Sequence, residues 1–431
     1  MKSTATNSVL YAISGLLLYG SGASVLAQQV PSSVSVTSLP SSSTLRAPVT
    51  FSPRPSSPMP TLSFSALQSS VLPALRARSS RGSSLPVRVL VAPAQKGSSP
   101  RLAPSNSGPQ CNLVGCIPYT TARVANSTVN GTPATAVQPV GGMPYVATGR
   151  LWMATTTAGQ FNSVCTASLI GKGLVVTAAH CIQRYGLGDA GTVKSVRFIP
   201  ANNGNTLSSG PYGGWDVAHI IQPAVYKAGT DTCSTAGIVC SNDVAVLVLA
   251  KNPAGQFPFS VPQIYYYNYG INGYGFVSPS GGSGGNGQIT QLGYPCGLDN
   301  CQLMQRNDSI GAITGTGIGS SPKQITIGSQ MTGGSSGGPW LVNFGTQSAL
   351  TGAGAGRAPV NNVVQATTSW GYVNNQIQIQ GASLFATNPQ FPIAQFTTDG
   401  RTFPGGNIGT LVNEACRSTG TAKGFTTGAC W

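Results

Sequence analysis

A short glycine-rich stretch, GGSSGGPW at residues 333–340, constrains the fold of this chain more than any other segment. Glycines on both sides of a serine allow positive φ angles and leave room for another chain to approach the backbone. Pro339 then blocks a helix, and the apolar residues 340–342 favour a strand. The stretch predicts a sharp turn that presents the Ser336 hydroxyl. Composition alone would not distinguish it from a flexible loop, since residues 280–287 (SGGSGGNG) are equally rich in Gly and Ser.

The chain has only two histidines, and their surroundings differ. A serine hydroxyl is a weak nucleophile near neutral pH, so it needs an adjacent base, usually a histidine that a carboxylate orients. His180 lies in TAAHC (residues 177–181), directly after an apolar run, whereas His219 has no motif around it. We predict that His180 is the base for Ser336 and that His219 is half-buried or at the surface.

The two motifs together resemble those of chymotrypsin-like serine proteases of the microbial type. TAAHC is similar to the family's histidine motif, and GSSGGP at residues 334–339 fits its Gly-x-Ser-Gly-Gly-Pro motif. Both occur in the family's order, and the resemblance covers about residues 140–414. It implies two six-stranded antiparallel β-barrels with the catalytic groups in the cleft between them.

A carboxylate should complete the site. The family's aspartate precedes an apolar strand, and Asp243 in NDVAVL (residues 242–247) has that setting. There it would accept the imidazole N–H and fix the ring tautomer. Asp216, in GWDVA (residues 214–218), is the alternative. The segment between His180 and Asp243 is longer than is usual in the family, and the Cys233/Cys240 pair could tighten it.

The resemblance implies further roles for backbone and pocket residues. The N–H groups of Gly334 and Ser336 would form the oxyanion hole, donating to charge that develops only in the tetrahedral intermediate. Ser369, Trp370 and Gly371 are similar to the segment that pairs antiparallel with the substrate backbone and forms one wall of the primary pocket.

The base of that pocket is expected near Gln330 and Thr332, with Met331 between them. None of the three is acidic, which argues against a preference for Arg or Lys. Thr368 stands where glutamate-specific relatives have a histidine. A medium-sized apolar or polar side chain is therefore the predicted specificity.

The serine motif also departs from the animal digestive members. These carry an aspartate just before the catalytic serine, where it pairs with the N-terminal amine that activation creates. This chain has Ser335 there, and residues 140–142 (VGG) only faintly resemble the Ile-Val-Gly-Gly start. We expect no such activation switch.

The first 104 residues differ in composition from the rest of the chain. Residues 1–27 have a basic start, an apolar core at 9–18 and a small-residue end, which predicts a signal peptide and a secreted protein, extracellular or periplasmic. Residues 28–104 are rich in Ser, Pro and Arg, lack acidic residues, and are expected to be a disordered pro-segment or linker. Their basic side chains could contact an anionic cell surface, and no motif supports nucleic-acid binding.

The remaining residues, 105–431, are expected to form the protease domain and hold all the cysteines. An even number in an exported protein favours disulfides over metal ligands, and the absence of a Cys-x-x-Cys pair argues against zinc, so we expect no metal and no cofactor. The resemblance implies a Cys165–Cys181 bridge, and the other pairings stay open. The cysteines are Cys111, Cys116, Cys165, Cys181, Cys233, Cys240, Cys296, Cys301, Cys416 and Cys430.

The local pattern predicts an all-β domain. Short runs rich in Val, Ile, Thr and Tyr alternate with Gly/Asn/Ser/Pro turns, and residues 407–416 predict a short terminal helix. The predicted strands are 168–170, 174–177, 193–199, 244–249, 324–327 and 362–369.

The predicted function is that of a monomeric, secreted serine endopeptidase that cuts proteins or peptides through an acyl-enzyme. An inactive homologue that uses the cleft as a binding module is the alternative. An esterase with the same three residues is disfavoured, because its serine elbow needs a following helix and the order Ser, Asp, His.

Overall fold

The computed structural model divides the chain into two units, residues 1–32 and 33–431. All the described residues lie in the second unit, so the predicted signal peptide, Cys111 and Cys116 lie outside them. The described residues are 33–39, 61–62, 117–124, 128–129, 132–133, 141–204, 206–207, 210–277, 285–345, 358–372, 377–398, 401–416 and 427–430.

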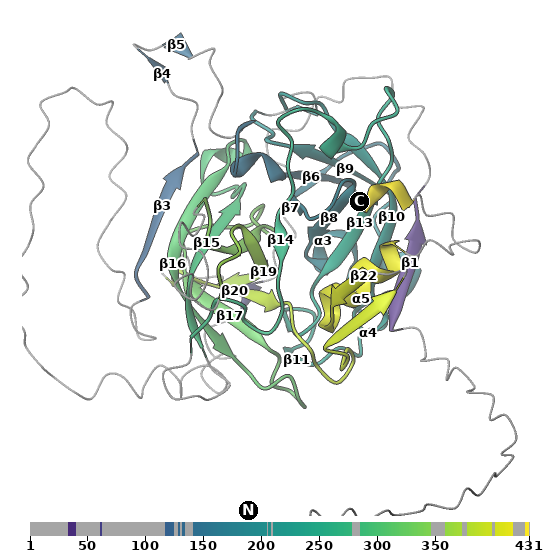
Figure 1. Cartoon of the computed structure of the whole chain (residues 1–431), viewed down its shortest axis with the longest axis vertical. Coiled ribbons are helices and arrows are strands. Elements are labelled where there is room, and N and C mark those ends of the chain that lie inside the picture. The colour runs from purple at the N-terminus through teal and green to yellow at the C-terminus, as the bar shows by residue number, and fades with distance from the viewer. Residues whose placement is uncertain are drawn as a thin grey trace, which may run out of the picture. The chain divides into compact units, whose positions relative to one another are not determined.

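Six antiparallel strands close the first barrel, drawn in teal in Figure 1. Their order is β10-β13-β8-β7-β6-β9, and pairing of β10 with β9 closes the ring. The strands β8 and β13 are buried along their whole length and consist mainly of Val and Leu, which suit a strand packed on both faces. The six are β6 (Thr148–Ala154), β7 (Ser163–Leu169), β8 (Leu174–Thr177), β9 (Ser195–Pro200), β10 (Trp215–Pro223) and β13 (Ala245–Leu249).

A second ring of six strands, drawn in green, forms the other barrel (Figure 1). Its order is β19-β18-β15-β16-β17-β20, and pairing of β19 with β20 closes it. Together the rings form the predicted chymotrypsin-like double barrel. The strands are β15 (Asn286–Gly293), β16 (Gln305–Thr314), β17 (Gln324–Gly328), β18 (Pro339–Val342), β19 (Val363–Tyr372) and β20 (Ile379–Leu384).

Shorter strands surround the barrels. One strand pairs with β16 and two pair with β19, while three two-stranded pairs stand apart from the barrel sheets. The single strands are β3 (Tyr119–Arg123) on β16, and β14 (Asn268–Tyr269) and β2 (Thr61–Leu62) on β19. The pairs are β4 (Thr128–Val129) with β5 (Thr132–Pro133), β11 (Cys233–Thr235) with β12 (Val239–Cys240), and β21 (Gln395–Thr398) with β22 (Arg401–Pro404).

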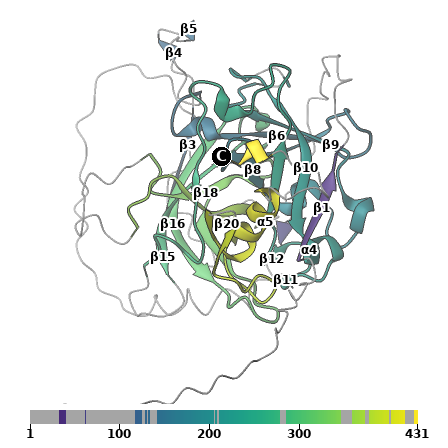
Figure 2. The ribbon, with the colours of Figure 1, turned by 45° about the vertical axis from the view of Figure 1, so that its right-hand side comes forward.

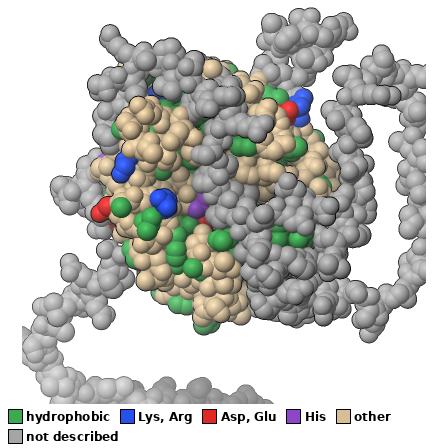
Figure 3. Space-filling model, turned by 180° about the vertical axis from the view of Figure 1, so that it is seen from behind, with side chains coloured by type: hydrophobic (Ala, Val, Ile, Leu, Met, Phe, Trp, Pro, Cys, Tyr) green, Lys and Arg blue, Asp and Glu red, His purple; other side chains and the backbone are tan. Residues whose placement is uncertain are grey.

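Helices are few and short in the described part of the chain. Besides short 3-10 helices, the α-helices are α3 (Ala179–Ile182), α4 (Ala224–Ala228) and α5 (Gly406–Cys416). The predicted terminal helix is α5, which packs against β10 and β13; Figure 2 shows it near β10. It places Ile408, Leu411 and Val412 in the hydrophobic core that includes the first barrel. None of the described helices is long and apolar enough to cross a membrane. Figure 3 shows few charged side chains among the described residues on one face.

The segment expected to be disordered contributes a strand to the first barrel. In β1 (Val34–Ser38), Val34 lies opposite Pro223 and Ser38 opposite His219, so the strand pairs with β10 antiparallel. β9 pairs with residues 215–216 of β10, and β1 pairs with residues 219–223 further along the same strand. The expectation of disorder therefore does not hold for residues 33–39.

Alternation explains why this polar segment forms a strand. Val34 and Val36 pack against the core of the first barrel, while Ser35 and Thr37 accept hydrogen bonds from Lys227 Nζ at 3.2 and 3.4 Å. Successive side chains of a strand point to opposite faces, so β1 has one apolar and one polar face. The composition of the whole segment hid this five-residue pattern.

Removal of β1 should destabilise the barrel. We expect a protein that begins at residue 40 to lose about 2 kcal/mol of unfolding free energy relative to one that begins at residue 28, because the packing of two half-buried valines is lost and an edge of β10 is left unpaired. Urea denaturation followed by tryptophan fluorescence measures the difference. Equal unfolding midpoints and slopes would show that β1 does not pair with β10 in solution.

Candidate active site

The turn at residues 333–338 is bonded to the first barrel through one residue of that barrel, Thr166. Thr166 on β7 donates its N–H to the Ser336 carbonyl and its Oγ1–H to the Gly334 carbonyl, both at 2.8 Å. The same Oγ1 accepts the Tyr294 N–H at 3.0 Å. Since Tyr294 follows β15, the Thr166 hydroxyl links a strand end and the turn in the second barrel to the first.

Two glycines fix the shape of this turn. Gly334 has φ +96° and Gly337 has φ +76°, which side chains rarely adopt. A Cβ atom would lie 2.4 Å from the Tyr294 carbonyl oxygen at Gly334, and 2.0 Å from Thr177 Oγ1 at Gly337. Both positions therefore require glycine for conformation and for space.

Within residues 334–336, the turn leaves two backbone N–H groups unused. The N–H groups of Ser335, Gly337 and Gly338 donate to backbone carbonyls. Those of Gly334 and Ser336 donate to no other described residue. The Ser336 hydroxyl is buried and also has no hydrogen-bond partner within the described part of the chain. Two free donors and one free hydroxyl thus occur within three residues.

Local hydrogen bonds support the turn at Ser335. Ser335 Oγ donates to the Thr332 carbonyl at 2.6 Å. From the loop that Cys296–Cys301 closes, Cys296 N–H donates to the Gly333 carbonyl and Gly297 N–H to Thr332 Oγ1, both at 2.7 Å. The Thr332 side chain, predicted near the pocket base, is thus engaged with this loop.

Neighbouring strands bring His180 and Asp243 to one edge of the first barrel. Thr177 at the end of β8 lies opposite Ala245 at the start of β13, so the residues just beyond them are adjacent. The Asp243 carboxylate accepts the His180 backbone N–H at 2.8 Å through Oδ1 and lies 2.7 Å from His180 Nδ1 through Oδ2. Both side chains are buried.

The alternative carboxylate and the second histidine lie on β10. Asp216 pairs with Arg197 of β9 at 3.1 Å, so Asp243 and not Asp216 contacts His180. His219 is half-buried opposite β1, with its Nδ1 3.1 Å from Ser38 Oγ, and burial lowers its pKa.

A bond between the barrels links Asp243 to the serine turn. Ser369 on β19 donates its hydroxyl to Asp243 Oδ2 at 2.6 Å, while its neighbour Thr368 accepts the Gly337 N–H at 2.8 Å through its carbonyl. Sequence reasoning placed Ser369 in the substrate wall and missed this contact. No spacing in the sequence could have revealed it, because β13 and β19 belong to different barrels.

The other predicted wall residues have separate surroundings. The Trp370 ring is fully buried, and its Nε1–H donates to Gln324 Oε1 at 2.9 Å. Gly371 pairs with Gln380 of β20 and, on another edge, with Thr61 of the parallel strand β2 (Thr61–Leu62). Gln330 is half-buried before the turn.

An uncharged network, which the sequence did not reveal, joins the segments expected to form the pocket. Gln291 Nε2 donates to Thr368 Oγ1 at 3.0 Å and to Gln380 Oε1 at 2.6 Å, while Gln291 Oε1 accepts the Ser329 hydroxyl at 2.8 Å. These buried amides fix residue 329 relative to β19 and β20. A glutamine on a strand carries no motif, so only the fold identifies Gln291.

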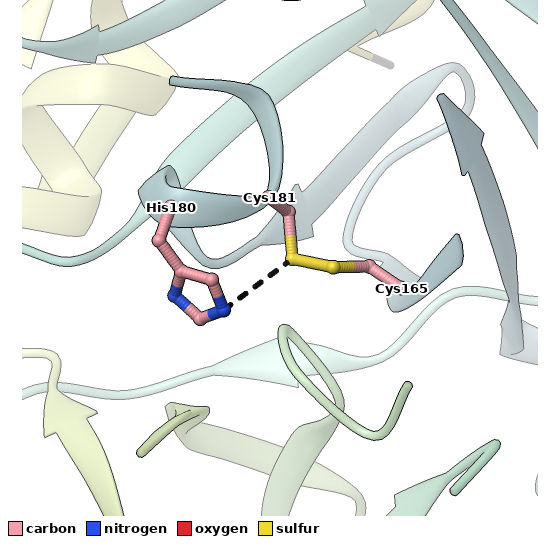
Figure 4. Close-up of side chains that lie close together, drawn as sticks. All are labelled: Cys165, His180 and Cys181. Carbon is pink, nitrogen blue, oxygen red and sulfur yellow. Dashed lines mark hydrogen bonds between the residues drawn. A yellow bond between two sulfur atoms is a disulfide. The ribbon is translucent and has the colours of Figure 1, made fainter. Parts of the chain in front are cut away.

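A disulfide lies beside the His180 ring. Cys165 on β7 is bonded to Cys181 in α3, and His180 Nε2 lies 3.9 Å from Cys181 Sγ (Figure 4). Because both sulfurs are bonded to each other, they offer no thiolate to a metal ion. The other disulfides in the described residues are Cys233–Cys240, Cys296–Cys301 and Cys416–Cys430.

Loss of the Thr166 hydroxyl should weaken the link between the barrels. We expect Thr166→Val to lower the unfolding free energy by about 2–3 kcal/mol, because the Gly334 carbonyl and the Tyr294 N–H lose their partner without exposure to water. Thr326→Val is the matched control, since Thr326 is buried and its hydroxyl has no hydrogen-bond partner among the described residues. Thermal unfolding of the two variants measures the effect, and equal stability of both would contradict this role of Thr166.

Comparison with known proteins adds family membership to this geometry. The Trypsin family profile matches residues 139–382. No curated protein sequence matches the chain. A thermostable serine protease, AL20, from an extremophilic microorganism is 22% identical, with 56% of this chain and 92% of that chain covered and a TM-score of 0.40.

Two further solved structures are similar at lower identity. Protease Anisep from Arthrobacter nicotinovorans is 19% identical over 57% of this chain and 92% of its own, with a TM-score of 0.40. A Glu endopeptidase in complex with MPD is 16% identical over 61% of this chain and 89% of its own, with a TM-score of 0.38. Since the profile spans more than half of the sequence, this chain belongs to the trypsin family of serine proteases.

Proposed function

We propose that this chain is a secreted serine endopeptidase in which Ser336, His180 and Asp243 form the catalytic triad. The observation that carries the proposal is the Asp243 carboxylate, which contacts the His180 backbone and ring through separate oxygens at 2.8 and 2.7 Å. Hydrogen bonds through Ser369, Thr368 and Gly337 lead from this carboxylate to the serine turn. A buried histidine oriented in this way is the base that a serine nucleophile requires.

The mechanism gives a role to the Ser336 hydroxyl and to both unpartnered N–H groups of the turn. Ser336 Oγ attacks a peptide carbonyl while His180 takes its proton, and Asp243 stabilises the imidazolium. The N–H groups of Gly334 and Ser336 donate to the oxygen that becomes negative. His180 then passes the proton to the leaving amine, and a water molecule activated by the same ring hydrolyses the acyl-enzyme.

The unpartnered Ser336 hydroxyl is compatible with this role. Hydrogen bonds between nucleophile and base are often long in proteases without substrate and tighten when substrate binds. Substrate backbone would align with Ser369, Trp370 and Gly371 on β19, on the edge where β2 pairs with Gly371 in this structure. The buried Trp370 ring would support that wall from behind.

We propose a preference for an uncharged side chain before the cut bond. The residues expected to form the base and the wall of the pocket, 330–332 and 369–371, contain no charged side chain. The Gln291 network behind them is also uncharged. A buried charge without a partner would cost several kcal/mol, so Arg, Lys and Glu should be disfavoured.

Export, monomeric state and partners are part of the same proposal. The leader-like residues 1–27 and the disulfides support an oxidising compartment outside the cytoplasm. Proteins or peptides are the proposed substrates, and the basic N-terminal segment is the part that would contact an anionic cell surface. We propose neither a cofactor nor a nucleic-acid partner.

Substitution of the nucleophile tests the proposal. We expect Ser336→Ala to lower hydrolysis of denatured casein by about three orders of magnitude or more, since the acyl-enzyme cannot form. Ser283→Ala, in the similarly composed stretch at 280–287, should retain full activity. Mass spectrometry of the products identifies the cut sites, which should follow uncharged residues.

The same proteins separate the two functions under consideration. A fluorophosphonate should label wild type on Ser336 and leave Ser336→Ala unlabelled. A folded wild type that neither cuts casein nor reacts with the fluorophosphonate would overturn the protease function in favour of a binding module.

A further inference from the structure

Asp231 is a buried carboxylate in the long segment between His180 and Asp243. Its side chain precedes the β11–β12 hairpin, which Cys233–Cys240 closes, and the residue is 8% exposed. No described lysine or arginine forms an ion pair with it. A buried acid without a cation needs hydrogen-bond donors to hold it.

The donors come mainly from the residue that precedes Asp243. Asp231 Oδ2 accepts the Asn242 backbone N–H at 2.9 Å, and Asp231 Oδ1 accepts Asn242 Nδ2–H at 2.7 Å. The Thr232 backbone N–H donates to Oδ1 at 2.7 Å. Three donors therefore converge on the carboxylate, two of them from Asn242.

Residues that follow the second barrel hold Asn242 from its other side. Asn242 Oδ1 accepts Asn388 Nδ2–H at 2.8 Å and Asn407 Nδ2–H at 3.2 Å. Asn242 is fully buried, and its backbone N–H and both ends of its side chain are bonded. A satisfied buried network of this kind fixes one arrangement of its members.

We propose that Asp231 is a positioning residue that, through Asn242, holds the Asp243 carboxylate in its two contacts with His180. The inference rests on the proposed protease function. Asn242 and Asp243 share a peptide bond, and Val244 N–H donates to the Asn242 carbonyl at 2.8 Å, so a shift of Asn242 moves Asp243. Misplacement of a catalytic group by about 1 Å can cost about 100-fold in rate.

An ionised acid at this place works against stability. Burial raises the pKa of Asp231 to about 6 from 3.8, and the nearby Asp243 adds to the rise. The folded state therefore binds the proton more tightly than the unfolded state, and the unfolding free energy falls as the pH rises from about 4 to about 6. The residue is thus better explained by the acceptors it supplies than by a gain in stability.

An amide could not supply the same acceptors. Asp231→Asn would retain one oxygen, which can bond Thr232 N–H and Asn242 Nδ2–H. Its NH₂ group would then face the Asn242 backbone N–H, donor against donor. The variant therefore loses the bond from the Asn242 backbone N–H, which is the bond nearest Asp243.

Protonation of Asp231 should have a similar effect in the wild type. The titratable groups that act on Asp231 are Asp243 just before β13, Tyr226 on α4 and Tyr185 before that helix. Burial raises the pKa of both tyrosines, so they stay neutral. A proton on Asp231 would turn one acceptor oxygen into a hydroxyl, which accepts more weakly from Asn242, and would leave Asp243 less well held.

Kinetics of the full-length protein test this role. We expect Asp231→Asn to lower kcat about tenfold or more, with KM within about twofold of wild type, because the substrate contacts are intact. The acid limb of the kcat/KM profile between pH 5 and 8 should change from a two-proton to a one-proton dependence. Asp308→Asn is the matched control, since this carboxylate also accepts three donor bonds, from Arg306 and Thr290, but lies on β16.

Each outcome bears on the proposal. An unchanged kcat and pH profile in a folded Asp231→Asn protein would overturn it, as would an equal change in Asp308→Asn. If Asp231→Asn does not fold, the wild-type acid limb decides, and a one-proton limb contradicts the role of Asp231. These results differ from failure of the protease function, in which wild type itself would be inactive and unlabelled by the fluorophosphonate.

Discussion

The pairing of β8 with β13 is the constraint on which the candidate site depends. The register Thr177 opposite Ala245 places the residues that follow β8 beside those that precede β13. A shift by one residue would turn every side chain of a fully buried strand to its other face, so this register is strongly fixed. The packing of the first barrel therefore brings His180 and Asp243 together, and the attraction between their side chains is not needed to do so.

The serine turn depends on bonds between the barrels, which hydrophobic packing alone would not direct. Thr166 holds the carbonyls of Gly334 and Ser336, and Ser369 reaches back to Asp243. Hydrogen bonds are directional and costly to leave unmade in a buried place. Polar groups at this interface can thus set the position of one barrel's residues relative to the other's.

Local signals in the sequence predicted much of the fold and part of the site. The predicted strands overlap β7, β8, β9, β13, β17 and β19, and α5 begins within a residue of its prediction, because alternation and turn residues act over a few positions. The glycines at 333–338 likewise predicted the positive φ angles of the serine turn. The contacts of Ser369 and Gln291 were missed, since each joins segments far apart in the sequence. The contact of Asp231 with Asn242 spans the β11–β12 hairpin and carries no motif, and β1 was hidden by the composition around it.

The segment between His180 and Asp243 shows how an insertion can be accommodated next to a site. Its length adds conformational freedom, which the Cys233–Cys240 bond and the Asp231 carboxylate restrict close to the point where the chain enters β13. The disulfide closes the hairpin but does not position the residues that follow Cys240. The carboxylate bonds the Asn242 backbone directly, so it extends that order to the residue before Asp243. An acid that lowers stability above about pH 4 can be retained because it supplies this order.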